Sequence, residues 1–132
     1  MKEFGLSKKE RIKSKKEFGL VFAEGKTIYS DNRELKAIYY VENNSELPGV
    51  KCAFAVHKKS GKAVWRNRVK RLLRESYRLN KHSIIKKCVT QNCLLLLIFS
   101  LNSVNQQKKN KIKLKDLLPG AVDLLNQIER DF

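Results

Sequence analysis

The sequence predicts an α+β fold, a two-layer sandwich in which helices pack against a small sheet. Two observations lead to this class. Short runs rich in β-branched and aromatic residues indicate strands, and other segments repeat apolar residues at helical spacing. Their order is α-β-β-β-α-β-α. Because the 132 residues contain no internal repeat or low-complexity linker, we expect one domain, 1–132, with a flexible N-terminus at about 1–10.

The first half of the chain predicts one helix and three strands. Ser14 and Glu17 have the spacing of a capping box, and Gly25 ends the short helix that follows. Phe18 and Phe22 lie on one face of this helix. The predicted strands are 26–30, 35–41 and 50–56, with a turn at 43–49.

The second half predicts two helices and one buried strand. A helix is expected from about Ala63 to Leu79, and the apolar run at 94–100 reads as a buried strand. Residues 80–92 are ambiguous, and we expect a further helical turn plus a loop there. Leu117 to Ile128 repeat apolar residues at helical spacing, and Pro119 fits only in the first turn of that helix.

The charge of the chain points to a polyanionic partner. Lys and Arg number 29 against 13 Asp and Glu, a formal net charge of +16. Such an imbalance disfavours the compact state by self-repulsion unless a polyanion is nearby. Nucleic acid is the first candidate and an anionic membrane surface the second. The longest apolar run, Cys93 to Phe99, is far below the roughly 20 residues that span a bilayer, and no secretory signal is expected.

The cysteines favour a reducing compartment. Cys52, Cys88 and Cys93 are odd in number, and two of them lie in apolar segments. We therefore expect buried free thiols in the cytoplasm rather than disulfides or a metal site.

The helix at 63–79 combines an apolar stripe with basic residues of a single sign. Trp65, Val69, Leu72, Leu73 and Ser76 share one side. The other side carries Arg66, Arg68, Lys70, Arg71, Arg74 and Arg78. Like charges four residues apart destabilise an isolated helix, and phosphates reverse that effect. The single-sign charge and Asn67 favour a polyanion-binding face over a merely solvated one.

Aromatic residues offer a second candidate surface. Phe18 and Phe22 lie one turn apart, and composition alone favours a place in the core. The alternative is a stacking platform for unpaired bases. Tyr39 and Tyr40 alternate across their strand, so one can face a groove and the other the core.

Enzyme signatures are poor. The stretch GLVFAEGKT departs from a phosphate-binding loop in its glycine spacing, and its first glycine falls inside a predicted helix. His57 and His82 have no Cys or carboxylate partner at the spacing of a nucleophile or metal site. We expect no self-sufficient catalytic site.

Two stretches resemble one known family. HKKSGKAVWRNRVKRLLRESYR, residues 57–78, resembles the signature of the bacterial ribonuclease P protein subunit, and RIKSKKEFGLVFAEGK, residues 11–26, resembles its first helix. The resemblance runs in order over about 6–100. Trp65 is bulkier than the family pattern leads us to expect.

The resemblance implies a fold and a function. The family has the order α-β-β-β-α-β-α with a left-handed βαβ crossover, against the usual right-handed rule. Its protein joins a catalytic RNA and helps remove the 5′ leader from precursor tRNA. Mg²⁺, held mainly by RNA and substrate, serves the hydrolysis. The implied partners are the catalytic RNA and precursor tRNA, with no membrane and no DNA.

The resemblance also implies site residues. The RNA-facing motif comprises Lys58, Lys59, Arg66, Asn67, Arg68, Lys70, Arg71 and Arg74. The cleft for the single-stranded leader, between the first helix and the sheet, comprises Phe18, Phe22 and Tyr39.

Three other readings fit part of the sequence. A plain RNA-binding or ribosome-associated protein suits the charge equally well, and only the family motif separates the two. A helix-turn-helix DNA binder is disfavoured because a strand precedes the basic helix. A protein-only nuclease lacks clustered carboxylates.

Overall fold

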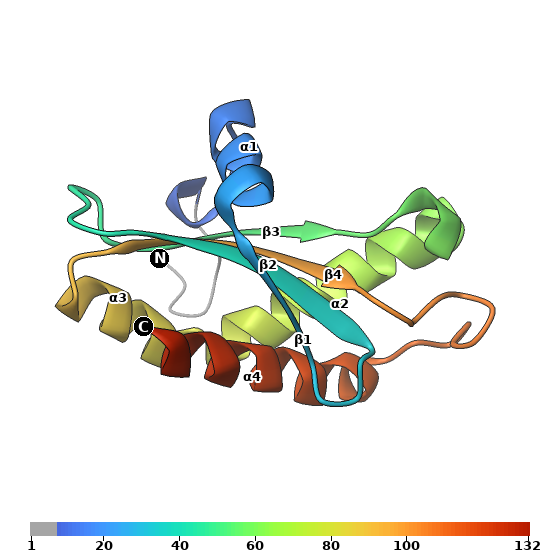
Figure 1. Cartoon of the computed structure of the whole chain (residues 1–132). Helices are drawn as coiled ribbons and strands as arrows, with labels where there is room; N and C mark the ends of the chain where they lie inside the picture. The colour runs from blue at the N-terminus through green and yellow to red at the C-terminus, as the bar shows by residue number, and fades with distance from the viewer. Residues whose placement is uncertain (1–7) are drawn as a thin grey trace.

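The computed structural model describes residues 8–132 and has a four-stranded sheet at its centre (Figure 1). The elements are the 3-10 turn η1 (Lys8–Glu10), α1 (Lys15–Glu24), β1 (Lys26–Tyr29), β2 (Leu35–Glu42), β3 (Gly49–Ala55), the 3-10 turn η2 (Lys58–Ser60), α2 (Ala63–Asn80), α3 (His82–Thr90), β4 (Leu94–Leu101) and α4 (Leu114–Asp131). The α+β class and the predicted order of the main elements are confirmed, and α3 is added to them.

The sheet has the strand order β1-β2-β4-β3. β2 pairs antiparallel with both β1 and β4, whereas β3 and β4 are parallel. β4 lies inside the sheet and is buried along almost its whole length, as its apolar sequence predicts. The segment between the parallel strands, which contains α2 and α3, forms a βαβ crossover; its left-handedness stays a prediction.

The main core lies between the sheet and helices α2, α3 and α4 (Figure 1). Alternate residues of two strands face these helices: Leu35, Ala37 and Tyr39 of β2, and Leu95, Leu97 and Phe99 of β4. Phe54 of β3 stacks on Phe99 with ring centroids 5.7 Å apart, and Tyr77 of α2 packs tilted against both rings. This aromatic group joins α2 to the centre of the sheet.

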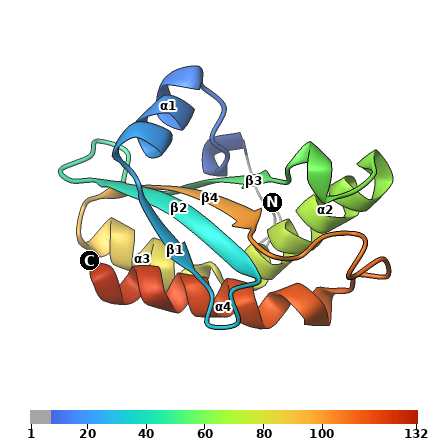
Figure 2. The ribbon, with the colours of Figure 1, turned by 45° about the vertical axis from the view of Figure 1, so that its right-hand side comes forward.

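Helix α1 covers part of the opposite face of the sheet (Figure 2). Val21 is fully buried there against a small cluster that includes Leu96 and Ile98. The predicted N-cap is confirmed, since the Ser14 hydroxyl accepts a hydrogen bond from the Glu17 backbone N–H at 3.1 Å. The Glu17 carboxylate also pairs with Lys51 of β3 at 2.8 Å, which ties α1 to the sheet.

The predicted turn and loop at 80–92 are wrong, because α3 is a helix of 9 residues. It buries Ile84 and Cys88 on its sheet side. Past Thr90, the last residue of the helix, the chain turns at Asn92, whose φ of 57° lies in the left-handed region. There the Cys93 N–H bonds to the Cys88 carbonyl at 3.0 Å, the pattern of a Schellman motif. The three cysteines are buried free thiols, as expected.

Helix α4 begins earlier than predicted and places Pro119 in its second turn rather than its first. The Asp116 carboxylate accepts a hydrogen bond from the Lys113 N–H at 2.8 Å, which fixes the start of the helix at Leu114. Pro119 lies on the exposed side, where a missing N–H and a bulky ring disturb no core packing.

The flexible N-terminus expected at about 1–10 stays a prediction, and residues 1–7 lie outside the described part. Residues 8–10 form η1, and two contacts lie in or next to it. Glu10 pairs with the buried Lys81 ammonium at 2.8 Å, and the Ile12 N–H donates to the Cys52 carbonyl at 2.9 Å.

Candidate nucleic-acid interface

Helix α2 is anchored by one stripe and exposes basic residues on the rest. The buried residues of the helix are Trp65, Val69, Leu73, Ser76 and Tyr77, and Leu72 is half-buried. An open hollow on its outer side is lined by Val64, Asn67, Arg68, Lys70, Arg71 and Arg74. The structure therefore brings most of the predicted RNA-facing motif together on one helix face.

Several arginines of this face are held in place by contacts through part of the guanidinium. The Arg66 Nε donates to the Gly61 carbonyl at 3.1 Å, and the Arg68 Nε donates to the Ile112 carbonyl at 2.8 Å. The guanidinium of Arg74 lies 5.7 Å from the ring centroid of Phe54. Since a guanidinium has five N–H donors, such contacts orient the group and leave further donors for a ligand.

The acid within this helix does not neutralise the basic face. Glu75 pairs with Arg78, one turn away, and this hydrogen bond lowers the pKa of the Glu75 carboxyl from its ordinary value. Arg66, Lys70 and Arg74 follow one another at intervals of four residues, which is an unfavourable arrangement for a bare helix. A polyanion beside this row would convert the repulsion into attraction.

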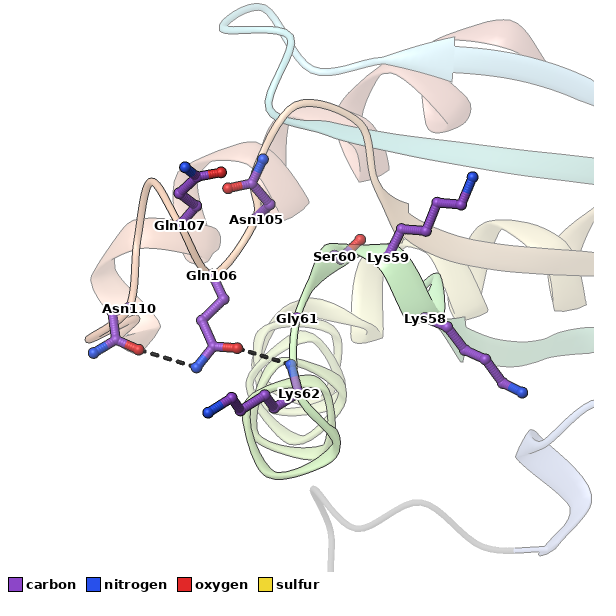
Figure 3. Close-up of a pocket in the computed structure, with 9 residues that line it drawn as sticks. All are labelled: Lys58, Lys59, Ser60, Gly61, Lys62, Asn105, Gln106, Gln107 and Asn110. Carbon is purple, nitrogen blue, oxygen red and sulfur yellow. Dashed lines mark hydrogen bonds between the residues drawn. The ribbon is translucent and has the colours of Figure 1, made fainter.

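Lys58 and Lys59 lie in η2, directly before α2. Both side chains are exposed, and the Lys59 N–H donates to the His57 Nδ1 at 3.1 Å. They line a second open hollow with Ser60, Gly61, Lys62 and the carboxamides of the β4–α4 loop (Figure 3). The family-derived motif is thus continuous from η2 into α2.

The two phenylalanines of α1 differ in exposure. Phe18 is half-buried and packs on the cluster that contains Val21. Phe22 is 61% exposed, so a place in the core is wrong for this residue. An exposed phenylalanine on a short surface helix is available to stack on a base.

Tyr39 does not lie on the α1 face, and its assignment to the leader cleft is wrong. Its ring is 4% exposed in the main core, and its hydroxyl donates a hydrogen bond to Asp131 of α4. Tyr40, the next residue, packs on the α1 side instead. The sequence contained a signal for this choice, because Lys36 and Glu42 share the side of Tyr40 and mark the wetter face.

Two further observations concern metal binding and membrane crossing. In the described part of the chain, no group of three or more His, Cys, Asp or Glu side chains could hold a metal ion. No helix within residues 8–132 is long and apolar enough to cross a bilayer.

The fold and its basic helix define a small α+β protein with a surface suited to a polyanion. Comparison with known proteins places it in a family. Residues 6–118 match the family model described as Ribonuclease P. The ribonuclease P protein component of Clostridium botulinum (strain Langeland) is 35% identical over 120 residues, which cover 91% of this chain and 95% of the relative. That of Clostridium novyi is 42% identical over 82 residues, covering 62% and 70%. The chain belongs to the ribonuclease P protein family.

Solved structures show the same fold. The Staphylococcus aureus RNase P protein matches with a TM-score of 0.67 and 22% identity, over 91% of this chain and 95% of that one. The Thermotoga maritima RNase P protein matches with a TM-score of 0.66 and 24% identity, over 92% and 96%.

Proposed function

We propose that this chain is the protein subunit of a ribonuclease P ribonucleoprotein, which removes the 5′ leader of precursor tRNA by endonucleolytic cleavage. Family membership supports this activity, and the features of α1 and α2 support a division of labour between two RNA ligands. The partners are the catalytic RNA and precursor tRNA, and the protein acts in the cytoplasm.

Helix α2 binds the catalytic RNA in this proposal. The observation that carries it is the basic face of α2, in which an apolar stripe fixes the helix while Arg68, Arg71 and Arg74 remain exposed. Arginine suits structured RNA because its planar fork pairs bidentately with phosphate. Lys58, Lys59, Asn67 and Lys70 extend the same surface, and Arg66 belongs to the same helix.

The α1 face binds the single-stranded leader. Phe22 offers an exposed ring for base stacking, and Phe18 and Tyr40 lie beside the sheet on the same side. Aromatic stacking beside basic groups accepts unpaired bases of any sequence. Tyr40 takes the place first assigned to Tyr39.

Catalysis belongs to the RNA subunit in this proposal. The described residues offer no cluster of ligands for a catalytic metal ion, and the family resemblance assigns Mg²⁺ mainly to RNA and substrate. The contribution of this chain is therefore to bind and orient the two RNAs.

A reconstitution tests the proposed function. The purified protein, the catalytic RNA of the same organism and both together are assayed on a precursor tRNA near physiological Mg²⁺. We expect the mixture to produce the mature 5′ end, and the protein alone to produce none. Cleavage by protein freed of RNA and contaminating nucleases, or no gain when the protein is added to the RNA, would contradict the proposal.

A further inference from the structure

The loop between β4 and α4 lies against the start of α2, away from α1 (Figures 1 and 2). We call residues 102–113 of this connection the docked loop. It lies outside the 57–78 signature and is rich in lysine. Its contacts with α2 give it a definite place on the basic surface.

Hydrogen bonds fix the docked loop along the first turns of α2. The Gln106 N–H donates to the Ser60 carbonyl at 2.7 Å, and the Gln106 Oε1 accepts from the Lys62 N–H at 2.8 Å. Further along, the Trp65 Nε1–H donates to the Lys109 carbonyl at 2.9 Å. The contact from Arg68 to the Ile112 carbonyl completes the row. The unexpected tryptophan thus serves as an anchor for the loop.

Gly61 allows this close approach. A Cβ atom at that position would lie 2.7 Å from the Trp65 ring and 2.8 Å from the Gln106 Cβ. Both distances are too short for any other residue unless the loop shifts. The backbone at Gly61 is extended, so the need for glycine comes from space rather than from its φ angle.

The docked loop adds positive charge to a region that is already basic. It carries Lys108, Lys109, Lys111 and Lys113. All four are exposed; Lys109 pairs with Asp116 at 3.3 Å, and the Lys108 Nζ donates to the Ser103 carbonyl at 3.4 Å. Hydrogen bonds therefore hold two lysine-bearing segments together against their mutual repulsion, and a polyanion lying across both would relieve it.

The lysines around the hollow point in different directions (Figure 3). Lys59 extends to one side, Lys58 to another and Lys62 to a third, while Gln106 points from the loop to the Lys62 backbone. Such side chains do not converge on a single small anion. They suit a chain of phosphates that passes over the surface.

We propose that the docked loop is a second RNA-binding segment, which extends the α2 face and contacts the phosphate backbone of the catalytic RNA through Lys108 and Lys111. The inference rests on the proposed function, because it assigns to the loop the same RNA that α2 binds. Gln106 and Trp65 are positioning residues, since they hold the loop at α2 rather than contact the ligand.

Binding of the full-length protein to the catalytic RNA, measured across a range of salt concentrations, tests the proposal. The Lys108→Gln/Lys111→Gln variant should bind more weakly, with a log–log salt slope shallower by about 0.9 per lost contact, or up to about 1.8. The matched control, Lys86→Gln/Arg130→Gln, removes the same charge from exposed positions on α3 and α4. It should keep the wild-type slope.

Gln106→Ala leaves every charge in place and removes the side-chain bonds of Gln106 to the Lys62 N–H and to Asn110, which loosens the loop at the start of α2. It should weaken RNA binding with little change in melting temperature. Unchanged binding by the double lysine variant, or equal losses in variant and control, would overturn the inference. If Arg71→Ala weakens binding in the same assay, the proposed function survives that result. If Arg71→Ala also binds normally, the role of α2 fails as well.

Discussion

The phenol of Tyr39 donates a hydrogen bond to the carboxylate of Asp131, joining the middle of β2 to the last turn of α4 across 92 residues. Lys26 of β1 reaches the same carboxylate at 3.2 Å. Burial and this hydrogen bond raise the pKa of Tyr39. The bonds from Tyr39 and Lys26 lower the pKa of Asp131. Two strands and the final helix thus meet at one carboxylate.

Tyr39→Phe should make stability less dependent on pH at both ends of the range. The raised pKa of Tyr39 contributes stability below the ordinary tyrosine value of about 10, and this contribution is lost as pH rises. The lowered pKa of Asp131 contributes stability above the ordinary aspartate value of about 4, and this contribution is lost as pH falls. Melting temperatures of wild type and variant from about pH 3 to 11 test this. If the melting temperatures of wild type and variant changed in parallel with pH, the Tyr39–Asp131 hydrogen bond would not be the cause of the pH dependence.

Glu10→Gln should destabilise the protein by about 3 kcal/mol, because it removes the negative charge that faces the buried Lys81 ammonium. Lys81 is only 4% exposed in its side chain, and the two groups lie 2.8 Å apart. Urea denaturation gives the free energy of unfolding. Glu24→Gln, at an exposed position on α1, is the control and should cost almost nothing. A loss no larger than that of the control would show that the pair is not coupled.

Phe22→Ala should weaken binding of precursor tRNA by the holoenzyme and leave binding of mature tRNA unchanged. Loss of one stacked base costs roughly 1–3 kcal/mol, or about 5- to 150-fold in affinity. Because Phe22 is 61% exposed, the melting temperature should stay near that of wild type. Val89→Ala on α3, a residue 54% exposed, serves as the control. An unchanged preference for precursor over mature tRNA would remove Phe22 from the leader site.

Arg71→Ala should weaken binding to the catalytic RNA and make the salt slope shallower by up to about one unit, since one phosphate contact is lost. The side chain is exposed, so the fold should be unaffected. Arg130→Ala at the end of α4 is the matched control. A drop in thermal stability with unchanged affinity would assign Arg71 a structural role.

The sequence indicated the fold well where one pattern dominated. The buried stripe of α2 and the apolar run of β4 could each be read from spacing and composition. Alternation separated Tyr39 from Tyr40, and Lys36 and Glu42 marked the side of Tyr40 as the wetter one. That helices α2, α3 and α4 cover the Tyr39 side and α1 the other is fixed by tertiary packing.

Other features were missed, one because a local cap was overlooked and two because they depend on contacts between distant parts of the chain. Helix α4 starts at Leu114 because of the local cap between Lys113 and Asp116, so Pro119 falls in its second turn. The short α3 is stabilised by burial of Ile84 and Cys88, which its mixed sequence did not reveal. The docking of Lys109 on Trp65 joins residues 44 positions apart and leaves no local signal.

The strand order β1-β2-β4-β3 has a consequence for synthesis of the protein. β4 is the last strand to emerge from the ribosome, yet it lies between two strands made earlier and pairs with both. A nascent chain that ends before Leu94 therefore has a hairpin of β1 and β2 and an unjoined β3, with open edges on both. Assembly of the sheet must wait for β4, and until then those edges are exposed to other chains.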